Sequence, residues 1–275
     1  MLRSTGDYYE ARVEVVAATV AAVRHRFSGI GEGIADVIAA GQMGMAATAV
    51  DYVGSAMAEQ ELVVAAAAGR VPPSSVAGAY TVDGVAVGSL DAVVSATVEE
   101  LLAQSEAEAL AWLDRFTAEQ LAAAASAAEA ASTANVRVTW TRMVNPPCCQ
   151  RCAVLAGRVY KVQGFQRHPH CDCVMVPTSE AKMGRSGAWV GPEDVTDLTR
   201  AQRRAIEDGA DMIRVINAHR VRVSGGVYTP TRSADGLTTT AFFGKPRLTP
   251  YGIYQLASDE DDAIRLLTVF GYIVP

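Results

Sequence analysis

The clustering of cysteines is the feature that most constrains how this chain folds. All five cysteines of the 275-residue sequence lie in one short segment: Cys148, Cys149, Cys152, Cys171 and Cys173. Two of the four histidines, His168 and His170, lie in the same segment. A C-x2-C pair followed by an H-x2-C pair is a metal-ligand pattern, because two such pairs can surround one ion. We therefore expect this segment to fold around a metal.

Zinc is the ion that a mixed set of thiolates and imidazoles favours in a reducing cytosol. Cys149 and Cys152 have the spacing of one ligand pair, and His168 and Cys171 have that of the second. Cys173 competes with Cys171 for the fourth place, because on a strand both side chains would point the same way. We favour Cys171. A reduced thiol cluster without metal and an iron–sulfur cluster are the alternatives.

The ligand set favours a structural site over a catalytic one. A structural zinc needs four ligands, and this segment offers more, whereas a catalytic zinc keeps an open position. The zinc deaminase signature requires P-C-x-x-C, but here Pro147 precedes Cys148, one residue out of register. The sequence also has no G-x-S-x-G nucleophile elbow and no Walker A loop. We therefore expect a protein that is not an enzyme and has no catalytic residues.

The distribution of charge and apolar residues bounds the partners. Residues 1–135 carry 6 Lys and Arg against 17 Asp and Glu, a net charge of −11, whereas residues 136–257 carry 17 against 9, a net charge of +8. Opposite charges suggest two different partners, and the basic region could contact nucleic acid through its phosphates. Solvated surfaces explain the charges equally well. Six basic residues flank the cysteines: Arg137, Arg142, Arg151, Arg158, Lys161 and Arg167.

Membrane insertion and secretion are not expected. No apolar run approaches the length of about 18 residues that a membrane-spanning helix needs. Asp7, Glu10 and Glu14 interrupt the apolar stretch that a signal peptide would require. The chain is therefore expected in the cytoplasm when it is made.

The predicted fold class is α+β, and its first region, residues 1–135, is acidic and mostly helical. Apolar residues recur at helical spacing over 8–23, 35–68 and, as one long helix or two abutting ones, 91–131. Gly41, Gly44 and Gly54 weaken the second of these helices. Breaks are expected at 28–33 and 69–75, and a loop or small hairpin with an Asp83-Gly84 turn at 78–88.

The other two regions are a β module and a helical C-terminal part. Residues 136–178 form a small zinc-ribbon-like module with short strands over 136–143, 158–162 and 173–177, and Trp140 is expected in its core. Residues 179–275 form a basic-to-mixed helical region with a mobile loop at 221–247. A capping box at Thr199 begins a helix that reaches about Ala218. Thr249-Pro250 begins another helix, and Gly271 ends the last one.

The cysteine segment resembles the phage Mu F-like minor capsid (head morphogenesis) proteins, and especially those of tailed phages of actinobacteria. The resemblance lies in Arg142 to Pro147, Cys149-Gln-Arg-Cys152, Leu155-Ala-Gly157, Tyr160, Gly164-Phe165 and Arg167 to Cys173. It covers about residues 136–177, with weaker support towards the C-terminus. One departure is Val174-Met-Val176, where members of that family often carry basic residues or histidine.

The resemblance implies a low-copy protein of the virion that lies at the portal vertex or inner head and assists head assembly or DNA packaging and ejection. The implied partners are the portal protein or the major capsid protein for the acidic region, and packaged DNA for the basic region 136–257. Two alternatives are a capsid maturation protease or other head-associated enzyme, for which His219 is the candidate base, and a zinc-dependent DNA-binding protein.

Overall fold

The computed structural model describes residues 2–29, 33–62, 73–75, 77–82, 85–136, 138–160, 173–178, 190–218, 221–224, 227–230, 233–240 and 246–274. Contacts divide the chain into two compact units, Met1–Asn145 with Ala156–Ala188 and Pro146–Leu155 with Trp189–Pro275. Helices predominate, and the sheets are small and antiparallel, which is consistent with the predicted α+β class. The predicted division into three functional regions stays a prediction.

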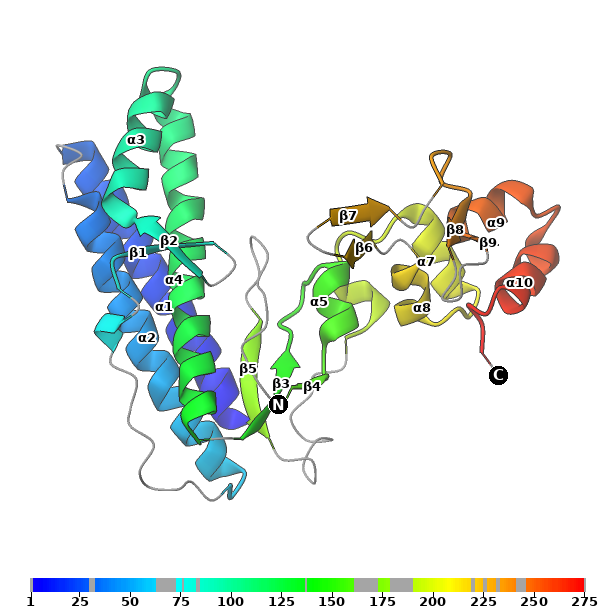
Figure 1. Cartoon of the computed structure of the whole chain (residues 1–275), viewed down its shortest axis with the longest axis horizontal. Helices are drawn as coiled ribbons and strands as arrows, with labels where there is room; N and C mark the ends of the chain where they lie inside the picture. The colour runs from blue at the N-terminus through cyan, green and yellow to red at the C-terminus, as the bar shows by residue number, and fades with distance from the viewer. Residues whose placement is uncertain are drawn as a thin grey trace. The chain divides into compact units, whose positions relative to one another are not determined.

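Four helices dominate the first unit: α1 (Arg3–Gly29), α2 (Ile34–Glu59), α3 (Leu90–Leu102) and α4 (Glu106–Val136). Figure 1 shows α1, α2 and α4 side by side, and their apolar residues form one core. The predicted break between the first two helices is confirmed. Gly33 precedes α2 in the left-handed region at φ 72°, which glycine adopts without strain. No helix in the described ranges is long and apolar enough to cross a membrane.

Close packing explains the glycine at position 41 of α2. The helix runs unbroken through Gly41, Gly44 and Gly54, although glycine weakens an isolated helix. A Cβ atom at position 41 would lie 2.6 Å from Oγ1 of Thr19 on α1, which is too close for any side chain. The absence of a side chain at Gly41 therefore lets the two helices approach, and their contact offsets the low propensity of glycine.

A hairpin precedes α3, as predicted. Strands β1 (Ala79–Val82) and β2 (Val85–Ser89) pair antiparallel, and the expected Asp83-Gly84 turn lies outside the described residues. Residues 91–131 were expected to form one long helix or two abutting ones. They form two, α3 and α4, which a turn at residues 103–105 separates. Tyr80 of β1 stacks on Phe116 of α4, with ring centroids 5.8 Å apart, and this contact joins the hairpin to the bundle.

The first unit also contains a three-stranded antiparallel sheet in the order β4-β3-β5: β3 (Thr139–Met143), β4 (Val159–Tyr160) and β5 (Val174–Thr178). The predicted strand start at Val136 is wrong, since the alanine-rich helix α4 continues through that residue. Trp140 is buried and stacks on Tyr160 at 4.2 Å, which confirms its expected core position. Arg142 is only 1% exposed, so it does not contribute to a basic surface.

A buried carboxylate joins the helices to this sheet. Glu129 of α4 is fully buried. Its Oε1 accepts a hydrogen bond from the Tyr8 hydroxyl of α1 at 2.7 Å, and its Oε2 accepts one from the backbone N–H of Met175 in β5 at 3.0 Å. Burial, and then the charge of Glu129, raise the pKa of Tyr8 well above its usual value, so the hydroxyl stays protonated and can donate.

The same strand receives a second side chain from the bundle. The side-chain amide of Gln60, at the C-terminal end of α2, donates to the carbonyl oxygens of Ala56 and Pro177. All five residues of β5 are buried, so backbone groups that face away from β3 need partners from within the protein. Glu129 and Gln60 supply such partners from two different helices.

The second unit is built from short elements. Its helices are α5 (Gln150–Leu155), α7 (Arg200–Glu207), α8 (Met212–Asn217), α9 (Pro250–Leu256) and α10 (Glu260–Val269), with a 3-10 turn, η3 (Pro192–Asp194). Two antiparallel hairpins pair β6 (Val221–Ser224) with β7 (Val227–Pro230), and β8 (Thr238–Thr240) with β9 (Pro246–Leu248). These strands occupy parts of 221–247, where the sequence predicted a loop.

The helix caps of this unit were well predicted, but one helix length was not. Thr199 and Gln202 form the expected capping box of α7, and the Thr249 hydroxyl accepts from the N–H of Gly252 at the start of α9. The helix from Thr199 was expected to reach about Ala218, which is wrong. It ends at Glu207, and Gly209 at φ 95° turns the chain before α8 begins.

Tyr272 closes the small core of the second unit. It is fully buried, and its hydroxyl donates to the carbonyl oxygen of Leu248 at 2.9 Å. The guanidinium of Arg247 lies 4.2 Å from the ring centroid. Burial raises the pKa of Tyr272 to about 12, although the Arg247 charge opposes the shift. Gly271 at φ 70° ends α10 just before it, as predicted.

Replacing Glu129 with alanine should lower the free energy of unfolding by about 2 to 5 kcal/mol, because the Tyr8 hydroxyl and the Met175 N–H would lose their buried acceptor. Urea denaturation followed by far-UV circular dichroism measures this loss. The matched control, Glu108→Ala, removes an exposed carboxylate from the same helix and should change the value by about 0.5 kcal/mol or less. Equal effects of the two substitutions would contradict a central role for Glu129.

Tyr272 should make the protein less stable at alkaline pH. Its pKa is raised on folding, so its contribution is fully present below about pH 10, where unfolded tyrosine is protonated, and is lost as the pH approaches 12. Over this interval the free energy of unfolding should fall by about 1.4 kcal/mol per pH unit from this residue. Comparing the wild type with Tyr272→Phe in urea at pH 9, 10 and 11 isolates the effect, and parallel pH profiles would refute it.

Candidate metal centre

Of the predicted ligands that the structure describes, Cys149 and Cys152 lie in the same unit, so their positions can be compared. Cys149 precedes α5 and Cys152 lies in its first turn. The backbone N–H of Cys152 donates to Sγ of Cys149 at 3.4 Å. Cys152 is buried and Cys149 is half-buried. A sulfur that accepts a backbone N–H across a two-residue gap is the arrangement expected of a thiolate ligand pair, because the donor stabilises negative charge on sulfur.

The backbone of Cys148 is hydrogen-bonded to a later segment of the second unit. Its N–H donates to the carbonyl oxygen of Asp194 at 2.8 Å, and its own carbonyl accepts from the N–H of Thr196 at 2.9 Å. These bonds form a bridge to the segment around Val195. Cys148 thus anchors the approach to α5, and its exclusion from the ligand set stays a prediction.

Residues far along the chain fix the start of α5. The side chain of Asp197 accepts a hydrogen bond from the N–H of Gln150 at 2.7 Å, and the Gln202 amide donates to Oε1 of Gln150 at 2.9 Å. Sequence reasoning identified Gln202 only as part of the Thr199 capping box and gave no role to Asp197. The one available signal was that capping box, which placed Gln202 at a helix start without revealing its contact with the cysteine loop.

The remaining predicted ligands are placed only in part. Cys173 belongs to the first unit, where it is fully buried immediately before β5. His168 and Cys171, and also His170, lie outside the described residues. Within the described part of the chain, no three His, Cys, Asp or Glu side chains come together in a way that could hold a metal ion. The full ligand set therefore stays a prediction.

The donor chemistry of the described cysteines fits zinc. Cys149 and Cys152 offer two soft ligands with two-residue spacing on a turn. Arg151 between them is exposed, so its charge lies in solvent near the pair. No nucleophile with an adjacent base accompanies it among the described residues, and the candidate base His219 lies outside them.

Residues 44–201 match the VG15 protein family. No curated protein and no solved structure shows a significant match to the chain. The matched segment covers more than half of the 275 residues and runs from within α2, through the sheet and all five cysteines, to the start of α7. The chain therefore belongs to the VG15 protein family, a family of phage proteins.

Proposed function

We propose that this phage protein is a minor capsid protein that lies at the portal vertex or inner head and assists head assembly or DNA packaging and ejection. The observation that carries the proposal is the family match, because it spans the bundle from within α2 through α4 and also the cysteine segment. The resemblance of residues 136–177 to Mu F-like minor capsid proteins adds the specific role. The long helices offer surfaces for assembly.

A structural zinc ion is part of this proposal. Cys149 and Cys152 would supply one pair of ligands, and His168 with Cys171 or Cys173 would supply the other. When bound, such an ion would cross-link the segments that carry its ligands, and its binding energy would add to the stability of the fold. Asp197 and Gln202 then serve to hold the first pair in place through Gln150.

Packaged DNA is a second proposed partner, through residues 136–257, but several of the basic residues are used inside the fold. Arg142 is buried. Arg203 is half-buried and donates to the carbonyl oxygen of Val195. Arg204 lies 4.5 Å from the ring centroid of Tyr254 but stays exposed. The basic charge available to phosphates is therefore smaller than the sequence count of +8.

The purified full-length protein should contain about one zinc ion per chain, as expected for a single four-ligand site. Cys149→Ser and Cys152→Ser should each remove most of this zinc, measured by inductively coupled plasma mass spectrometry. Cys148→Ser is the matched control and should keep it. Comparing Cys171→Ser with Cys173→Ser identifies the fourth ligand. A zinc content that none of these substitutions changes would refute the site.

The position in the virion can be tested in the phage that encodes this chain. Mass spectrometry of purified particles should detect the protein at low copy number, and it should remain with heads from which tails have been removed. Its absence from particles, combined with an accumulation of uncleaved capsid protein when His219 is replaced by alanine, would instead support the protease alternative.

A further inference from the structure

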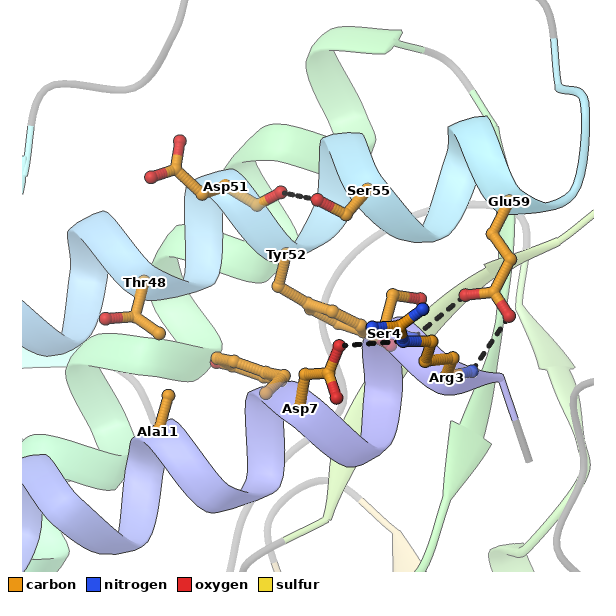
Figure 2. Close-up of a pocket in the computed structure, with 10 residues that line it drawn as sticks. Arg3, Ser4, Asp7, Ala11, Thr48, Asp51, Tyr52, Ser55 and Glu59 are labelled. Atoms are coloured by element: carbon orange, nitrogen blue, oxygen red, sulfur yellow. Dashed lines mark hydrogen bonds and ion pairs between the residues drawn. The ribbon is translucent and has the colours of Figure 1, made fainter.

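The groove between α1 and α2, which measures about 490 Å³, is closed below by the core of the bundle (Figure 2). Tyr8 and Tyr52 stack on each other beneath it and are only 3% and 4% exposed. The Glu59 carboxylate at its edge accepts hydrogen bonds from the backbone N–H groups of Arg3 and the next residue. These contacts hold α1 against α2. Side chains with redox chemistry lie instead in the cysteine loop of the second unit, residues 148–152.

Cys149 and Cys152 have a fixed backbone relation at the start of α5. The carbonyl oxygen of Cys149 accepts the first hydrogen bond of the helix, from the N–H of Ala153 at 3.0 Å. Two Cα atoms three residues apart in such a turn lie about 5 Å from each other, given the rise and radius of an α-helix. Disulfides span about 4.4 to 6.8 Å between Cα atoms. The backbone therefore suits a bond between these two sulfurs.

The side chain of Cys149 already points towards this partner. Its Sγ accepts the N–H of Cys152 at 3.4 Å, so the sulfur lies over the turn. Both residues are reduced in the structure. Because side chains change rotamer readily and the backbone spacing is suitable, rotation about side-chain bonds is expected to bring the two sulfurs together.

The two sulfurs differ in their access to solvent. Cys152 is only 3% exposed, whereas Cys149 is half-buried. A dissolved oxidant therefore meets Cys149 first. Cys152 lies one turn away, where it can attack the sulfur that the oxidant has modified. The pair thus combines an accessible attacking thiol with a protected resolving thiol.

Cys148 is the competing thiol of this loop. It is buried, and its backbone N–H and carbonyl oxygen are hydrogen-bonded to Asp194 and Thr196. A disulfide from Cys148 to Cys152 would pull against these hydrogen bonds. We therefore expect Cys149 to be the preferred partner.

We propose that Cys149 and Cys152 form a reversible disulfide, which replaces the zinc-binding state of the pair when the protein leaves a reducing cytosol. The oxidant is a small-molecule disulfide. Cys149 displaces one thiol from it and forms a mixed disulfide, and Cys152 then displaces the second thiol. Two protein thiols are thus oxidised, one disulfide is reduced to two thiols, and the protons pass through water to the released thiols. The inference rests on the proposed virion role for this setting, because a released particle is no longer in the cytosol.

Oxidised glutathione is the probe, added to the purified full-length protein. After acid quenching, denaturation and alkylation of the remaining thiols, trypsin cleaves at Arg151 and separates the two cysteines. Mass spectrometry then detects the disulfide as a link between peptides 143–151 and 152–158. The alkyl group marks whichever of Cys148 and Cys149 stayed free.

The native protein should link Cys152 to Cys149 about tenfold or more in preference to Cys148, because the turn raises the effective concentration of one partner over the other. Concentrated urea should reduce this preference, and reduced glutathione should reverse the link. Equal use of Cys148 and Cys149 in the native protein would overturn the proposal, and so would links that run only to Cys171 or Cys173.

Single substitutions test the order of the two steps. Cys152→Ser should accumulate a glutathione mixed disulfide at Cys149. Cys149→Ser should react at Cys152 about tenfold or more slowly, because Cys152 is buried. Cys148→Ser is the matched control and should keep the wild-type link. Equal rates in the first two variants would contradict the assigned order.

Zinc content measured in the same samples separates this inference from the proposed function. A protein without zinc that still forms the Cys149–Cys152 link refutes only the zinc site. A protein that contains zinc but forms no link refutes only the disulfide. Neither result depends on whether the protein is found in virus particles.

Discussion

The buried carboxylate of Glu129 is the constraint around which the first unit is organised. A charge inside an apolar core is costly unless hydrogen bonds satisfy it, so its two donors must stay in place. These donors come from α1 and β5, which lie far apart in the sequence. Satisfying one side chain therefore fixes the position of the first helix and of the strand that begins directly after Cys173. A shift of α1 along α4, or of β5 along β3, would therefore break a hydrogen bond to Glu129.

Elements governed by local signals could be predicted from the sequence. Gly33 and Gly271 mark helix boundaries by their positive φ, and the capping box at Thr199 starts α7 where expected. The 78–88 hairpin follows from its turn residues. In the candidate metal centre, Cys149 and Cys152 lie on one turn, where the Cys152 N–H donates to the Cys149 sulfur, and their role as ligands stays a prediction. Each of these signals depends only on residues within one or two turns of chain.

Features that depend on distant contacts could not be predicted. Helix propensity gave no reason to keep Gly41 in an unbroken helix, because the reason is Thr19 on another helix. The sequence suggested that Arg142 belongs to a basic surface. The structure buries it through tertiary packing, which the sequence alone does not reveal. The support of the cysteine loop by Asp197 comes from 47 residues away.

The hydrogen bonds that α2 and α4 make to the backbone of β5 have a consequence for aggregation. A strand at the edge of a sheet normally offers free N–H and C=O groups to strands of other molecules. Here Pro177 lacks an N–H, its carbonyl is taken by Gln60, and the N–H of Met175 is taken by Glu129. On this side the sheet cannot grow by adding a strand from a neighbouring chain. The protein is therefore expected to stay free of intermolecular sheets formed through β5 when it is concentrated.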